Sequence, residues 1–191
     1  MPTGTPNKIK FGLSKCYYAK KTNSGYGTPV AMPGAVALSL AAQGELYKFY
    51  ADNIAYWRNE VNNGYEGDLE LALIPDEFLS DILGNTLEST DKVLVEEVQN
   101  TPTEFALGFQ IEGDAKNSRF WIYNCVATRP SIDGETKEDK IEAQTEKIKI
   151  SSTPTENGIV RARTTVDTPQ QTYDGWFSEV WEMPAPSTAT T

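Results

Sequence analysis

The chain has 191 residues and a formal net charge of −10, and 39% of its residues are hydrophobic against 23% charged. A chain of this length can bury roughly 70% of the surface that it exposes when unfolded, so the composition favours a single globular domain over a disordered chain. The acidic balance also disfavours a protein that binds nucleic-acid phosphates, because that contact needs patches of Lys and Arg.

The predicted elements begin with strands. Apolar residues at every second position predict a strand over residues 7–13 that continues through Tyr17-Tyr18. The same alternation predicts a strand over residues 36–40. Two short aromatic-rich strands are expected at 45–50 and 54–57, with Ala-Asp-Asn between them.

The strand predicted over 65–74 has two different faces. Acidic residues alternate with leucines, so one face is expected to be buried and the other wet. The buried face carries Leu69, Leu71 and Leu73. The wet face carries Glu66, Asp68 and Glu70.

A helix of about two turns is predicted after this strand. Pro75 suits the first helical position, and Asp76 and Glu77 place negative charge in the first turn, where the helix dipole favours it. Two apolar pairs with a spacing of four residues, Phe78/Ile82 and Leu79/Leu83, give the helix a buried face. Gly84 can end it in the left-handed conformation.

The rest of the chain predicts more strands and one more helix. Further strands are expected at 92–98, 104–112, 119–128, 145–151 and 158–166. The pairs Trp176/Val180 and Phe177/Trp181 predict a second short helix behind Asp174, with an extended segment as the alternative. Many closely spaced strands with only two short helices indicate a mainly β fold, a β-barrel or β-sandwich.

The predicted domain layout is simple. Residues 1–6, rich in Pro, Gly and Thr, are expected to form a flexible arm, followed by a single β domain at 7–182. Residues 183–191, rich in Pro, Ala, Ser and Thr, are expected to form a disordered tail. The N-terminus shows no signal-peptide pattern and no apolar run is long enough to span a bilayer, so we expect folding in a cytoplasm and no membrane partner.

Charge is distributed unevenly along the chain. Residues 1–44 hold five lysines and no acid, residues 45–115 hold sixteen acids and three bases, and residues 116–191 hold eleven acids and nine bases. A basic N-terminal third and an acidic middle would let neighbouring copies attract each other in a fixed order. The alternative is that these are solvated faces of one soluble domain. The candidate contact residues are Lys8, Lys10, Lys15, Lys20, Lys21, Arg129 and Lys137.

The sequence contains no recognisable catalytic, cofactor or metal site. It has no histidine, which removes the commonest general base and zinc ligand. Glu66, Asp68 and Glu70 could in principle form a glycosidase-like carboxylate set, but acids on one strand face are more often solvating charge. Cys16 and Cys125 lack a CxxC or His partner and are expected to be buried, reduced thiols. We therefore expect no enzyme activity and no cofactor.

Several segments together resemble the major tail protein of long-tailed, non-contractile bacteriophages of Gram-positive hosts (siphovirus type), the subunit of the tail tube. They are GYEGDLELALIPD at 64–76, FAL at 105–107, GD at 113–114, YNCVATRP at 123–130, QTE at 144–146 and WF at 176–177. KIKFGL at 8–13 and YADN at 50–53 extend the likeness over nearly the whole domain.

The resemblance implies a β-barrel or sandwich with a flanking helix, assembling as hexameric rings that stack into a tube. In such tubes an inner β-barrel lines the lumen through which DNA passes without specific binding, and tape measure and tail terminator proteins are partners. Loops at 20–33, 50–64 and 129–143 are then candidates for contacts between rings. Glu66, Asp68 and Glu70 become candidate lumen-facing acids, and the protein would reside in the virion tail.

Two other function classes remain open from the sequence. One is a monomeric β-sandwich that acts as a binding or adhesion module, and its tail would then be a linker remnant. The other is a glycosidase-like enzyme, which the lack of histidine and of a convergent carboxylate motif disfavours.

Overall fold

The computed structural model describes residues 8–114, 116–136 and 143–184, and its fold is mainly β, as the sequence predicted. The expected arm at 1–6 and most of the expected tail at 183–191 lie outside the described residues. The first strands are β1 (Lys8–Thr22), β2 (Gly25–Tyr26), β3 (Val30–Met32), β4 (Ala35–Gln43), β5 (Leu46–Ala51), β6 (Ile54–Glu60) and β7 (Gly64–Leu71). The later strands are β8 (Thr86–Leu87), β9 (Leu94–Val95), β10 (Phe105–Asp114), β11 (Ser118–Ala127), β12 (Glu146–Ser152) and β13 (Arg161–Arg163). The helices are α1 (Asp76–Asp81), α2 (Gln170–Asp174) and the 3-10 helix η1 (Gly175–Phe177).

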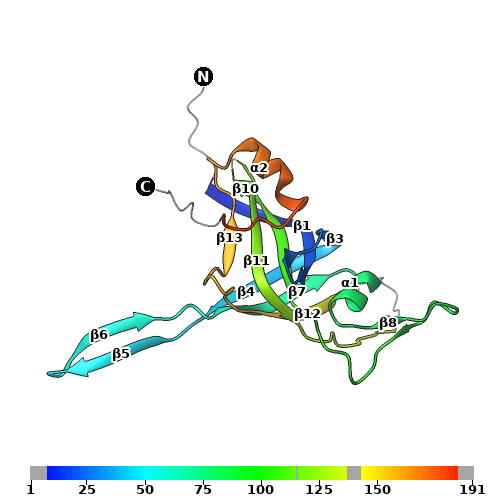
Figure 1. Ribbon diagram of the computed structural model, residues 1–191, viewed down its shortest axis with the longest axis horizontal. Helices are drawn as coiled ribbons and strands as arrows, with labels where there is room; N and C mark the ends of the chain where they lie inside the picture. Colours follow the sequence, from blue (N-terminus) through cyan, green and yellow to red (C-terminus); the bar gives the residue numbers. More distant parts are fainter. Residues whose placement is uncertain (1–7, 115, 137–142, 185–191) are drawn as a thin grey trace.

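The main sheet is antiparallel and folds over on itself, with the strand order β2-β1-β10-β11-β12-β7-β4. In Figure 1, β10 and β11 rise above β4, β7 and β12, which run across the base of the molecule. Strand β11 joins the two parts, because its first half pairs with β13 and its second half pairs with β12. This arrangement is a β-sandwich whose two layers share one strand.

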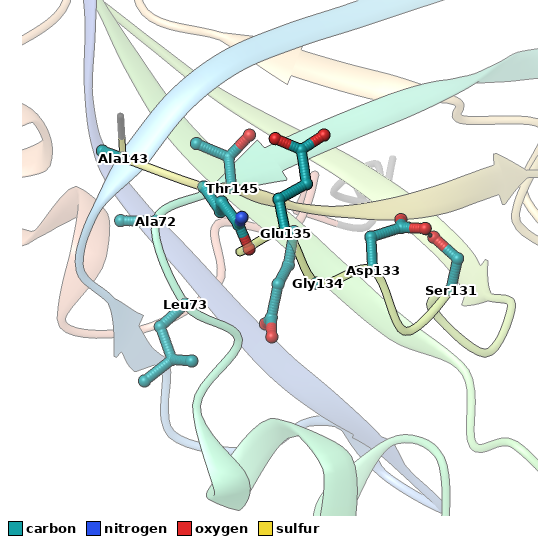
Figure 2. A pocket seen from close by; sticks show the side chains of 10 residues that line it. Ala72, Leu73, Ser131, Asp133, Gly134, Glu135, Ala143 and Thr145 are labelled. Carbon is teal, nitrogen blue, oxygen red and sulfur yellow. Dashed lines mark hydrogen bonds between the residues drawn. The ribbon is translucent and has the colours of Figure 1, made fainter. Parts of the chain in front are cut away.

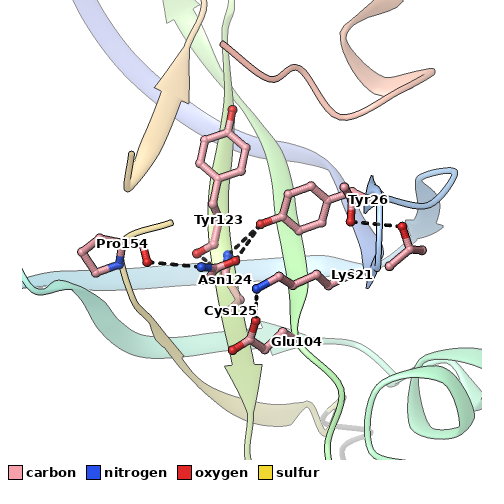
Figure 3. A network of polar contacts seen from close by, with 9 residues as sticks. Lys21, Tyr26, Glu104, Tyr123, Asn124, Cys125 and Pro154 are labelled. Atoms are coloured by element: carbon pink, nitrogen blue, oxygen red, sulfur yellow. Dashed lines mark hydrogen bonds and ion pairs between the residues drawn. The ribbon is translucent and has the colours of Figure 1, made fainter. Parts of the chain in front are cut away.

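Asn124 marks the point at which β11 changes partner. Its φ of 45° is left-handed, a conformation that Asn tolerates better than most residues. The Tyr26 hydroxyl donates to Asn124 Oδ1 at 2.9 Å and accepts from its backbone N–H, and Asn124 Nδ2 donates to the Pro154 carbonyl at 3.2 Å (Figure 3). These hydrogen bonds give the buried polar side chain of Asn124 its partners at the point where the ladder of β11 is interrupted.

The main core lies between the two layers. Leu69 and Leu71 of β7 are fully buried there, so this part of the predicted alternation is confirmed. Leu73 lies beyond the end of β7 and is exposed, so its predicted burial is wrong. Helix α1 covers one end of the core and inserts Phe78, whose ring meets the Tyr18 ring edge-on with centroids 5.1 Å apart.

The predicted first helix is confirmed, while the second differs from its prediction. Helix α1 begins after Pro75, and Gly84 has a φ of 77°. Near the C-terminus the chain is helical from Gln170 to Phe177 only, earlier than the segment behind Asp174 that the apolar pairs predicted. The chain leaves the helix after Phe177, which lets Trp181 stack on Trp176 with ring centroids 6.0 Å apart.

Residues 170–181, which we call the C-terminal segment, cover the outer face of β1, β10 and β11. Trp121 and Tyr123 of β11 are buried beneath it, and Trp121 Nε1 donates to the Trp176 carbonyl at 3.0 Å. As a result residues 105–110 of β10 are all buried. Two of the predicted strands are also shorter than expected, since 92–98 contains only β9 and 158–166 only β13.

Candidate functional surfaces

The outward face of β4, β7 and β12 carries the three acids predicted to lie on a wet strand face. In the register of the sheet, Glu66, Asp68 and Glu70 stand opposite Ala41, Ser39 and Ala37 of β4 on one side. On the other side they stand opposite Ser151, Lys149 and Lys147 of β12. The face is therefore polar, with small side chains along β4.

Two of these acids form ion pairs with lysines from β12. Lys149 Nζ lies 2.7 Å from Glu66 Oε1, and Lys147 Nζ lies 3.6 Å from Glu70 Oε2. Glu66, and to a smaller extent Asp68, raises the pKa of Lys149. Thr145 donates a further bond of 2.5 Å to Glu70. Three acids and two lysines leave this face with one excess negative charge. The ion pairs of Glu66 and Glu70 with lysines give no support to a glycosidase site built from these carboxylates.

Strand β4 forms one edge of this three-stranded layer. Within the described residues β4 pairs only with β7, so its other side has no ladder partner there. Residues 22–44, which include β4, contain no charged residue. Natural edge strands are commonly protected by charges or proline, because an open edge pairs readily with another chain. Strand β12 lies at the opposite edge of the layer. Among the described residues, its first part, Glu146–Ile148, pairs with β7 on one side and has no ladder partner on the other.

Strands β5 and β6 form a hairpin that projects from the body, at the left of Figure 1. Its turn residues Asp52 and Asn53 have φ values of 50° and 62°, as in the tightest hairpin turns. This confirms the two predicted aromatic-rich strands. The side chains from Leu46 to Glu60 are exposed, except for the partly buried Ala51 and Ala55. A two-stranded hairpin without a core is at best marginally stable in water.

The opposite end of the molecule also presents acidic side chains to solvent. Helix α1 and the β8–β9 segment lie at the right of Figure 1, far from the hairpin. We call the exposed residues Asp76, Glu77, Asp91 and Glu97 the acidic end, although an exposed cation, Lys92, lies next to Asp91. Beside them in sequence, Val93 and Val98 are exposed, Val98 almost completely at 95%. Each end of the long axis therefore presents apolar side chains to solvent.

The candidate contact lysines differ in their surroundings. Lys8 begins β1, and the side chains of Lys10, Lys15 and Lys20 are exposed. Lys21 forms an ion pair with Glu104 of the same chain (Figure 3), and Arg129 lies 2.9 Å from Glu96. These two cations are therefore already paired within the subunit. Lys137 lies outside the described residues.

A solvent-open depression of about 460 Å³ lies beside the end of β7 (Figure 2). Its carboxylates are Asp133, which accepts a 2.7 Å bond from Ser131, Glu135, and Glu146, which accepts a 2.7 Å bond from the Ile74 N–H. These bonds are local turn and strand-end contacts. Within the described residues no group of three or more His, Cys, Asp or Glu side chains could hold a metal ion.

The sequence matches no known family model, and a comparison with curated proteins also finds no match. In the part of the chain that the structure describes, no helix is both long and apolar enough to cross a membrane.

Proposed function

We propose that this protein is a virion structural protein, the subunit of a phage tail tube of the siphovirus type. Copies assemble into hexameric rings, the rings stack end to end, and the resulting tube conducts the genome into the host. Tape measure and tail terminator proteins are its expected partners in the virion tail. The likeness of the segments at 64–76 and 123–130 to major tail proteins supports this proposal.

The observation that carries the proposal is the open, uncharged edge of β4. Such an edge favours addition of a strand from another chain, and in a layer with a second open stretch on β12 the same contact can repeat from copy to copy. Repeated contacts between two different edges are heterologous, and they close into a ring when the rotation between copies allows it. The mainly β fold is compatible with a barrel built in this way.

The polar face of β4, β7 and β12 would then form the wall of the channel. Its carboxylates are held by lysines of the neighbouring strand and one negative charge remains in excess, so the wall offers no cationic patch to the phosphates of DNA. A duplex can slide along such a surface without being bound.

A monomeric binding or adhesion module is the second candidate, and the β5–β6 hairpin favours it. Exposed Tyr and Trp side chains on a projecting loop resemble the composition of binding loops, where rigid aromatic residues supply contact area. In that case the hairpin would contact a different molecule and the protein would stay monomeric.

Size in solution and electron microscopy distinguish the two candidates. The tube proposal predicts rings or tubes of wild-type protein in negative stain, and loss of rings in Val36→Lys, which places a charge on the exposed part of β4. Val166→Lys is the matched control, because Val166 is equally exposed but lies outside the strands. Wild-type protein that stays monomeric at high concentration and never forms rings would contradict the proposal.

A further inference from the structure

The open edge of β4 is longer than the open stretch at the other side of its layer. Strand β4 has nine residues and pairs only with β7 within the described residues, whereas the open stretch of β12 is limited to Glu146–Ile148. An added strand gains one set of backbone hydrogen bonds for every second residue that pairs, so a longer match binds better. In free subunits, the strand that best matches the β4 edge in length is therefore β4 of a second copy.

The backbone groups that face this open edge can be identified from the end of the strand. The Gln43 carbonyl accepts a 2.8 Å bond from the Asn63 N–H, on the side of β7. In an antiparallel sheet the N–H and C=O groups of successive residues point to alternate sides of the strand. Those of Leu38, Leu40 and Ala42 therefore point to the open edge, where an added antiparallel strand would bond to them.

An antiparallel pair of β4 strands centred on Ser39 is self-complementary. Leu38 of each copy then stands opposite Leu40 of the other, on the core side of the layer, where both leucines are only partly buried in the single subunit. On the outer face Ser39 meets Ser39, and Ala37 meets Ala41, so the facing side chains are small and uncharged. The pair therefore completes the burial of the two leucines.

Charge does not oppose this contact. Strand β4 carries no charged residue, and the nearest charged row in the layer is Glu66, Asp68 and Glu70 of β7. In the pair, two β4 strands separate the two β7 strands, so the acidic rows lie about 14 Å apart, or three strand spacings. This exceeds the screening length of about 8 Å at physiological ionic strength. Lys149 and Lys147 also pair with two of the three acids.

We infer that free subunits form an isologous dimer in which β4 pairs antiparallel with β4 of a second copy. The same patch serves both copies, so the contact closes at two and does not grow into a filament. The inference rests on the proposed function in one respect, because the dimer covers the β4 edge that a ring would use. Dimer and ring then exclude each other, and the dimer holds subunits back from assembly.

Ser39→Lys tests the two-fold register of the pair. It places two lysines directly opposite each other, so the dimer should weaken by about fivefold or more in sedimentation equilibrium at low salt and recover at high salt. Within its own subunit the new lysine stands opposite Asp68, which favours the fold. Ser39→Gln is the matched control, since it lengthens the side chain without a charge and should dimerise like the wild type. Dimers of Ser39→Lys at wild-type strength in low salt would overturn the inference.

A cross-link tests the same position independently. Ser39 points its own backbone groups to β7, so the Ser39 pair is of the non-hydrogen-bonded kind, with Cα atoms about 4.5 Å apart and within reach of a disulfide. Ser39→Cys should give linked dimers and nothing larger on mild oxidation, because both native cysteines are buried. Ser151→Cys, exposed on β12 of the same outer face, is the control and should link far more slowly. Equal rates for the two variants would overturn the inference.

Electron microscopy of the linked Ser39→Cys dimer separates this inference from the proposed function. We expect no rings from the oxidised dimer and rings after reduction. Rings from the oxidised dimer would overturn the inference, because one edge cannot serve both contacts. A wild type that dimerises but forms no rings would contradict the proposed function and leave the dimer standing. Rings from a wild type that shows no dimer would do the opposite, and a strictly monomeric wild type without rings would contradict both.

Discussion

Gly108 of β10 lies beneath the indole ring of Trp121 of β11, with no space for a side chain between them. A Cβ atom at position 108 would lie 2.6 Å from the ring, closer than carbon atoms can approach. The pair shows how tightly the outer face of the sheet packs under the C-terminal segment.

Gly108→Ala should therefore destabilise the protein by about 1–3 kcal/mol, the usual cost of overpacking a core. Chemical unfolding followed by circular dichroism measures the change. Gly134→Ala is the control, because a Cβ atom at position 134 would meet nothing within 4 Å. Equal stability of the two variants would show that the ring moves aside at little cost.

Arg119 attaches the C-terminal segment to the sheet. Its guanidinium carbon lies 3.8 Å from the centre of the Tyr173 ring, and its nitrogens donate to Gln110 Oε1 and to the Tyr173 carbonyl. Arg119→Lys keeps the charge but loses the planar stack, so we expect a loss of about 1–2 kcal/mol. Hydrogen exchange should accelerate first in residues 170–177. Arg163→Lys should leave that segment unchanged.

The two cysteines should be inert in the folded protein. Burial raises the pKa of the Cys16 thiol and of the Cys125 thiol to about 12, and the thiolate is the reactive form. At pH 8 iodoacetamide should label neither in native protein and both in guanidinium chloride. Rapid labelling of either one without denaturant would show that its strand opens readily.

Tyr26 should contribute to stability below about pH 10 and lose that contribution as the pH rises further. Burial raises its pKa from 10.0 to about 12, so the folded state favours the neutral hydroxyl that binds Asn124. Tyr26→Phe should cost about 1 kcal/mol at pH 8 through the lost hydrogen bond. The difference from wild type should shrink between pH 10 and 12. A difference that is constant with pH would contradict this account.

The exposed N-terminal lysines should take part in assembly if the basic segment contacts an acidic neighbour. Glu substitutions at Lys10, Lys15 and Lys20 should then weaken polymerisation, measured by light scattering. Lys21→Glu would instead break an ion pair within the subunit, because Lys21 is already paired with Glu104 of the same chain. It therefore does not test a contact between copies. Unchanged polymerisation of the triple variant would refute the contact and leave the fold unaffected.

Much of the local structure could be predicted from the sequence. The alternation of leucines and acids in 64–71 predicts one strand with a buried and a wet face, because successive side chains of a strand point to opposite sides of the sheet. Helix α1 follows from Pro75, its apolar spacing and Gly84. The segments at 45–50 and 54–57 with a short polar turn predict a hairpin, and they form one. Each of these signals lies within a few consecutive residues.

The candidate surfaces depended on contacts that no local pattern contains. Lys147 and Lys149 neutralise Glu70 and Glu66 from about eighty residues further along the chain, through a strand pairing that alternation does not specify. Burial of both faces of β10 required the C-terminal segment to fold over it. The strands and their acids follow from the sequence, since the period of a strand is local. Tertiary structure decided which acids are paired, which strand edge is open and which surfaces lie at opposite ends of the molecule. The reason is that strand order and long-range packing bring residues together that are distant in sequence.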